Sequence, residues 1–177
     1  MAKKVISMTL SQGSVQNAIK ELRGYQNSLE YKCRLLAEKL AEKGVEIARS
    51  YVTDLDAVFT GDLMRSIHLE HVGDIKGGCV YSVIADDESA LFVEFGTGIV
   101  GQQSPYPGKL PEGVTWEYAS GNTIRQLADG RYGWFYRDDN GQWWFTEGMP
   151  SRPFMYYTAN ELRDLIIETA KEVFTVD

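Results

Sequence analysis

The sequence predicts an α+β fold, in which a mostly antiparallel sheet is accompanied by a long N-terminal helical region and a C-terminal amphipathic helix. Apolar residues recur at steps of three or four over residues 14–51 and again after Pro153, which is the spacing of a helical face. Between these stretches, β-prone runs are separated by glycine-rich turns, and one of them predicts an aromatic-rich β-hairpin insertion. The length of 177 residues suits a single domain, 1–177, with the insertion at about 99–148.

The N-terminal region begins with residues 5–10, which predict a short strand or an extended lead-in, and Ser11 or Ser14 can then cap a helix. An unbroken helix over residues 14–51 would be about 57 Å long, whereas a compact domain of this size is about 31 Å across. We therefore expect either a bend at Gly24 or Gly44, or a segment that projects and packs on a neighbour. The apolar positions are Val15, Ile19, Leu22, Tyr25, Leu29, Cys33, Leu36, Leu40, Ile47 and Tyr51.

The middle of the chain predicts two paired strands. A capped single turn at residues 60–63 leads into a strand from about Ser66 to Val72. The glycine-rich loop 73–78 then returns the chain to a second strand from Cys79 to Ala85, and the acidic residues 86–88 end it.

The strongest local pattern is the hairpin at residues 134–146. Asn140-Gly141 suits the two centres of a type I′ turn, which pairs Tyr136 with Phe145 and Arg137 with Trp144. Arg137 and Trp144 would then form a cation–π pair on one face. Clustered aromatic residues are more often core or interface anchors than sugar-stacking platforms. The candidate interface residues are Trp134, Tyr136, Trp143 and Trp144.

The C-terminal helix is expected to begin at Pro153, because the fixed φ and missing N–H of proline suit the first helical position. One apolar stripe then runs toward the C-terminus. Its members are Met155, Ala159, Leu162, Ile166, Ala170 and Val173.

The net charge of −7 is distributed unevenly. Residues 1–50 carry nine basic and five acidic side chains, so the remainder of the chain is strongly acidic. An acidic balance works against tight DNA binding, which depends on cations that displace phosphate counterions. The asymmetry indicates either a solvated helix face beside an acidic sheet, or complementary surfaces that meet head to tail between subunits.

The sequence predicts a protein of the cytoplasm without a membrane segment. It has no apolar run of about 18 residues and no stretch typical of a signal peptide. Cys33 and Cys79 are compatible with reduced thiols, and no paired Cys or His motif has the spacing of a zinc site.

We predict no catalytic residues, no cofactor and no metal, because motifs for a nucleophile, a phosphate loop or a dinucleotide site are absent from the sequence. His68 and His71 would point to opposite faces of a strand. Glu94 lies among large apolar residues, so we expect a paired or hydrogen-bonded carboxylate. The enzyme alternative is a metal-assisted hydrolase that uses His68, His71 and Asp86.

Three short blocks resemble the phage tail-component family, the minor neck proteins of long-tailed bacteriophages. The first is Thr60-Gly61-Asp62-Leu63-Met64-Arg65-Ser66-Ile67, similar to the family's Thr-Gly-x-Leu-x-x-Ser-Ile. The second is Phe92-Val93-Glu94-Phe95-Gly96-Thr97-Gly98, and the third is Gly148-Met149-Pro150-Ser151-Arg152-Pro153-Phe154-Met155, which precedes a last helix in the family as well. About 50 residues separate the second block from the third, as in the longer versions from phages of Gram-positive hosts.

The resemblance implies a structural virion protein of the head–tail neck or of tail completion, which forms a homo-oligomeric ring around the DNA channel and has no enzymatic activity. It implies connector and tail proteins as partners, DNA that passes without sequence-specific binding, and a location in the virion after assembly in the host cytoplasm. The alternative is a carbohydrate- or cell-wall-binding module that uses Trp134, Trp143 and Trp144 of the Trp-rich hairpin. The residues that match the family are expected to have scaffold roles: Thr60, Gly61, Leu63, Ser66, Glu94, Gly96, Thr97, Arg152, Pro153 and Phe154.

Overall fold

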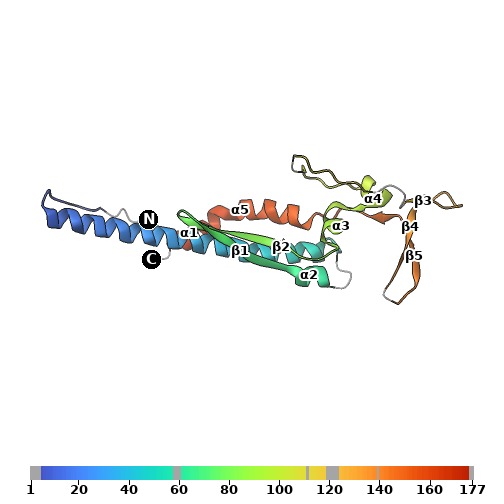
Figure 1. Ribbon diagram of the computed structural model, residues 1–177, viewed down its shortest axis with the longest axis horizontal. Coiled ribbons are helices and arrows are strands. Elements are labelled where there is room, and N and C mark those ends of the chain that lie inside the picture. Colours follow the sequence, from blue (N-terminus) through green and yellow to red (C-terminus); the bar gives the residue numbers. More distant parts are fainter. Residues whose placement is uncertain (1–4, 58–60, 111, 119–123, 139, 176–177) are drawn as a thin grey trace. The chain divides into compact units, whose positions relative to one another are not determined.

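The α+β fold is confirmed in a computed structural model of the chain, which describes residues 5–57, 61–110, 112–118, 124–138 and 140–175 (Figure 1). The helices are α1 (Gln12–Asp54), α2 (Asp62–Ser66), α3 (Ala90–Phe95), α4 (Gly98–Gln103) and α5 (Phe154–Thr175). The strands are β1 (Ile67–Ile75), β2 (Gly78–Ala85), β3 (Arg125–Gln126), β4 (Tyr132–Arg137), β5 (Trp143–Thr146) and β6 (Gly148–Met149).

The chain divides into two compact units. The first unit holds residues up to Val45, Leu69–Val83 and the chain from Glu161 onward. The second unit holds Glu46–His68 and Ile84–Asn160, and it includes the whole segment predicted as an insertion. That the two units act as one domain stays a prediction.

Helix α1 is continuous through Gly24 and Gly44, so neither glycine interrupts its 43 residues (Figure 1). At its start, the Ser11 Oγ accepts a hydrogen bond from the Ser14 N–H at 3.4 Å, which confirms Ser11 as one of the two predicted caps. Residues 5–9 form the extended lead-in and not a strand.

Gly44 lies at a close contact between α1 and two other segments of the first unit. A Cβ at this position would lie 2.9 Å from Val83 Cγ2 and 3.0 Å from Leu162 Cδ1. Ala41 and Val45 on either side are buried. The glycine thus allows β2 and the later part of α5 to approach the helix backbone, which a larger residue would prevent.

Strands β1 and β2 form a two-stranded hairpin, as predicted, but with a shorter turn. The predicted loop over residues 73–78 is wrong, because β1 continues to Ile75 and β2 resumes at Gly78. Gly77 adopts φ 85°, which lets a turn of only two residues, Lys76 and Gly77, reverse the chain.

Helix α5 begins at Phe154, one residue later than predicted, so Pro153 precedes the helix. The predicted stripe is wrong at Ala159 and Ile166, which are exposed. Two threonines are buried instead, because their hydroxyls find partners: Thr158 Oγ1 donates to the Phe154 carbonyl at 2.7 Å, and Thr169 Oγ1 accepts from Lys43 Nζ at 3.0 Å. Fully or largely buried positions along α5 are Phe154, Thr158, Thr169 and Val173.

The second unit contains a three-stranded antiparallel sheet in the order β3-β4-β5. The predicted register of β4 and β5 is wrong by one residue: Phe135 pairs with Phe145, Tyr136 with Trp144 and Arg137 with Trp143. The Asp138 N–H donates to the Gln142 carbonyl at 2.9 Å, and of the two described residues within the turn, Asn140 and Gly141, only Gly141 has positive φ, at 82°. A type I′ turn would need positive φ at Asn140 as well.

The physical reason for this register is the Asp138 carboxylate. Its Oδ1 accepts from the Gln142 N–H at 2.8 Å, and its Oδ2 accepts from Trp144 Nε1 at 2.9 Å. These two hydrogen bonds hold a turn that ends in a left-handed glycine, as three-residue hairpin loops commonly do. The β3–β4 connection repeats this design, since the Leu127 N–H donates to the Arg131 carbonyl and Gly130 adopts φ 88°.

Candidate interaction surface

The entry of α5 is built around Glu94, whose side chain is 7% exposed. Oε2 accepts a hydrogen bond from the Met155 N–H at 2.9 Å, and Oε1 accepts one from the Tyr156 N–H at 3.0 Å. These are the second and third residues of the helix, whose N–H groups have no partner within the helix. A side chain 60 residues upstream thus caps α5, and the expectation that Glu94 is hydrogen-bonded is confirmed.

Pro153 explains why a distant cap is needed. Its carbonyl accepts the first helical hydrogen bond, from the Tyr157 N–H at 3.1 Å, so it occupies the position where Ser, Thr or Asp usually cap. Proline has no side-chain acceptor. The carboxylate of Glu94 supplies that acceptor and places negative charge at the positive end of the helix dipole.

Arg152 ties the same entry to two other segments of the second unit. Its N–H donates to the Val93 carbonyl at 2.8 Å, and its Nε donates to the Leu55 carbonyl at 2.9 Å. Phe154 beside it is 0% exposed. We call Glu94, Arg152, Pro153 and Phe154 the helix-entry junction, and all four were predicted to have scaffold roles.

Gly96 and Thr97 complete this region. Gly96 has φ 79°, and a Cβ on it would lie 2.6 Å from the Ser151 backbone nitrogen. Thr97 Oγ1 accepts from the Met149 N–H at 3.2 Å, and Thr97 pairs with Met149 in an isolated β-bridge. The second and third blocks of the sequence therefore lie side by side, and only glycine fits at the closest approach.

Burial raises the pKa of Glu94, and the two backbone N–H groups that it caps oppose this effect. Burial dominates, so the pKa lies above its ordinary value of 4.5.

The first block has a matching structural role in its described part. Thr60 lies outside the described residues. Gly61 adopts φ 80° before α2, and Leu63 is 6% exposed. Ser66 Oγ donates to the Leu63 carbonyl at 2.8 Å, which closes the short helix before β1.

A series of contacting aromatic rings extends from Trp116 to Tyr156 within the second unit. Trp116, which the sequence did not single out, donates from Nε1 to the Gly96 carbonyl at 2.9 Å, and its ring lies 5.0 Å from that of Phe95. Phe95 contacts Tyr106 at 4.8 Å, and Tyr106 contacts Tyr156 at 5.5 Å. Its proline-rich surroundings gave no periodic pattern that could have identified Trp116.

The four candidate interface residues lie on two faces of the β3-β4-β5 sheet. The observed register places Trp134, Tyr136 and Trp144 on one face and Trp143 on the other. Trp134 is half-buried, and its ring lies over Gly98. The other three are exposed, Trp143 at 65%. The three exposed rings therefore do not share one surface.

The face that carries Trp143 is rich in arginine. Arg125, opposite Gly133 in the register, lies on it, as do Arg131 and Arg137 by strand alternation. The Arg131 guanidinium lies 4.9 Å from the centre of the Phe145 ring, so the cation–π pair of this hairpin is Arg131–Phe145 and the predicted Arg137–Trp144 pair is wrong. Phe135 packs on Phe145 at 5.3 Å and is itself exposed. We call this set the arginine face: Arg125, Arg131, Phe135, Arg137, Trp143 and Phe145.

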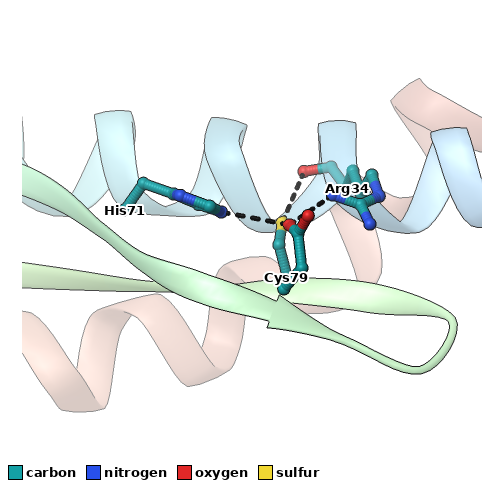
Figure 2. A network of polar contacts seen from close by, with 4 residues as sticks. Arg34, His71 and Cys79 are labelled. Carbon is teal, nitrogen blue, oxygen red and sulfur yellow. Dashed lines mark hydrogen bonds and ion pairs between the residues drawn. The ribbon is translucent and has the colours of Figure 1, made fainter.

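A polar network in the first unit joins α1 to the β1–β2 hairpin (Figure 2). Arg34 forms an ion pair with Asp74, and His71 Nε2 lies 3.3 Å from the same carboxylate. Cys79 Sγ lies 3.9 Å from the Arg34 carbonyl. The Arg34 guanidinium lowers the pKa of Asp74, and the side chains of this ion pair are about half exposed.

His68 and His71 do not converge on an ion site. His68 Nδ1 lies 2.7 Å from the Ser66 carbonyl, whereas His71 contacts Asp74 and the Tyr81 ring. In the described part of the chain, no three His, Cys, Asp or Glu side chains are grouped so that they could hold a metal. None of the described helices is both long and apolar enough to cross a bilayer.

Comparison with family models, curated proteins and solved structures gives no match to this chain.

Proposed function

We propose that this chain is a structural subunit of the neck or tail-completion region of a long-tailed bacteriophage, and that it assembles as a ring around the DNA channel. The observation that carries the proposal is the helix-entry junction, where the second and third family-like blocks meet. Glu94 of one block caps the helix that follows the other, and Arg152 donates to the Val93 carbonyl. These hydrogen bonds join the two blocks, which supports the scaffold roles that the resemblance implies for these residues.

The exposed surface supports a protein whose contacts are with other proteins. Large aromatic side chains are exposed on both faces of the β3-β4-β5 sheet, among them Phe135, Trp143 and Trp144. Exposed aromatic and arginine side chains are typical of the anchors of protein interfaces. In this proposal the partners are further copies of the chain together with connector and tail proteins, and the acidic remainder of the chain leaves DNA free to slide.

The test is co-expression with the connector and tail proteins of the same phage. We expect the chain to co-purify with at least one of them and to give rings in negative-stain images. A chain that stays monomeric and binds none of these proteins would contradict the proposal.

The carbohydrate alternative rests on the exposed Trp143 and Trp144. Because they lie on opposite faces, each would stack a sugar separately. Pull-down on cell-wall glycans tests this alternative with Trp143→Ala and Trp144→Ala as controls. Retention of the wild-type chain that both substitutions weaken would favour a glycan-binding module over a neck subunit.

A further inference from the structure

The first half of α1 carries an apolar stripe that the described residues of its own unit leave about half exposed. Ile19, Leu22, Tyr25 and Leu29 are 43%, 55%, 56% and 41% exposed. Figure 1 shows this half of the helix extending past the β1–β2 hairpin of the same unit. In proteins, most of the stability of a helix comes from packing of its apolar face. This exposed segment of α1 would therefore gain stability from a partner on its apolar side.

The stripe has the spacing of a coiled coil. Starting at Val15, steps of four and three lead through Ile19, Leu22, Gln26 and Leu29, which alternate as d and a positions of successive heptads. The same series continues to Cys33, Leu36 and Leu40, which are half-buried. A seam that repeats every seven residues over three heptads indicates a second helix, since sheets and loops do not share this period.

We infer that this stripe docks on the same stripe of a second copy, as a parallel coiled coil in register. Gln26 is the polar residue among the a positions of the exposed half, and a single polar a residue fixes register when it meets its own copy. In this alignment Tyr25 at g lies beside Glu30 of the second copy at e, and Lys32 lies beside Ala37 of the second copy, so no like charges oppose each other. A twofold axis along the helices gives parallel chains in register, so this contact is isologous and joins two copies of the chain.

This inference goes beyond the proposed ring assembly, because it joins two copies through identical surfaces, whereas the contacts that close a ring are heterologous. Its test uses the full chain with Cys33→Ala, which keeps this seam position apolar, and Cys79→Ser, and Gln26→Cys is introduced into it. Mild oxidation is expected to give a disulfide-linked dimer, because a-position side chains meet across a parallel seam. Asn17→Cys, at the f position on the opposite side of the same helix, is the matched control and is expected to stay uncrosslinked.

A second pair of variants measures the apolar contact itself. Leu22→Asp is expected to weaken self-association about tenfold or more in sedimentation experiments. It removes a leucine that the coiled coil would bury, and it adds a charge at the seam. Tyr31→Asp, on an f residue that is 65% exposed, is expected to leave association unchanged. Circular dichroism of both variants checks that the chain still folds.

The outcomes separate the two proposals. Rings or connector complexes without a Gln26→Cys crosslink would overturn the coiled coil and leave the neck function standing. A crosslinked dimer that neither forms rings nor binds connector and tail proteins would support the coiled coil and contradict the neck function. Equal crosslinking of Gln26→Cys and Asn17→Cys would overturn the inference as well.

Discussion

At the scale of single residues, Glu94 joins two segments of the second unit that lie far apart in the sequence. It is buried, it serves two backbone N–H groups of α5, and Pro153 leaves that helix without a local cap. Hydrogen bonds to a charged acceptor contribute about 1.5–3 kcal/mol each, whereas burial of the carboxylate opposes them. The balance of these effects is measurable.

Glu94→Ala is expected to lower the free energy of unfolding by about 2 kcal/mol, the upper range for loss of a helix cap. Urea denaturation followed by circular dichroism measures it. Glu88→Ala, in the exposed turn before α3, is the control and is expected to change stability by less than about 0.5 kcal/mol. Equal effects of the two substitutions would show that the cap contributes nothing.

The raised pKa of Glu94 makes a prediction about pH. The folded state binds a proton on Glu94 more tightly than the unfolded state does. Protonation of Glu94 therefore stabilises the fold at low pH, and this stabilisation is lost as pH rises from about 4.5 through the folded-state pKa. The free energy of unfolding of wild type minus that of Glu94→Gln should therefore decrease as pH rises through this window, because glutamine does not titrate. Urea denaturation of both proteins at a series of pH values tests it, and a difference that grows with pH would show that the pKa is lowered instead.

At the scale of elements, the two glycines of α1 have opposite roles. Gly44 lies against Val83 and Leu162, whereas a Cβ on Gly24 would meet nothing within 4 Å. Glycine costs a helix interior about 1 kcal/mol relative to alanine. Gly24 therefore only weakens the helix, and Gly44 offsets this cost by close packing.

Gly24→Ala is expected to stabilise α1 by up to about 1 kcal/mol, and Gly44→Ala to destabilise the first unit by about 1–3 kcal/mol through overpacking. Thermal unfolding of both variants gives the comparison on one helix with one substitution type. If Gly44→Ala stabilised the protein as much as Gly24→Ala, the neighbouring Val83 and Leu162 would have to move away at no cost.

At the scale of the whole molecule, the exposed aromatic residues of the β3-β4-β5 sheet present two different surfaces. The arginine face combines cations with Phe135 and Trp143, and the other face carries Tyr136 and Trp144. In a chain of net charge −7, the arginine face is complementary to acidic protein surfaces. We expect it to be the face that contacts other subunits or neck partners.

Trp143→Ala is expected to weaken binding to the co-purifying partner by about tenfold or more, because tryptophan and arginine dominate interface energies. Trp144→Ala is the matched control on the opposite face and is expected to bind within about twofold of wild type. Trp143→Ala should not shift the melting temperature by much, because this side chain is exposed. Trp144→Ala also removes the hydrogen bond to Asp138, so its melting temperature is measured beside its binding. A larger loss for Trp144→Ala would assign the contact to the other face.

The sequence by itself determined the features that depend on neighbours a few residues apart. The periodicity of α1, a cap at Ser11 or Ser14, the existence of both hairpins and the α+β class follow from such local preferences. The structure has these features, with Ser11 as the cap. It also identified Glu94 as a carboxylate in need of a partner. The partner was beyond its reach, because the N–H groups of Met155 and Tyr156 come to Glu94 only when the chain folds.

The tertiary structure decided which face each residue uses. The observed β4–β5 register, in which Asp138 binds Gln142 and Trp144, places Trp144 and not Trp143 on the face of Trp134 and Tyr136, since side chains alternate along a strand. Lys43, 126 residues before Thr169, donates a hydrogen bond to the Thr169 hydroxyl, and this partner allows the threonine to be buried on α5. Such choices depend on hydrogen bonds between side chains and distant partners, and no local pattern of apolar and polar residues encodes them.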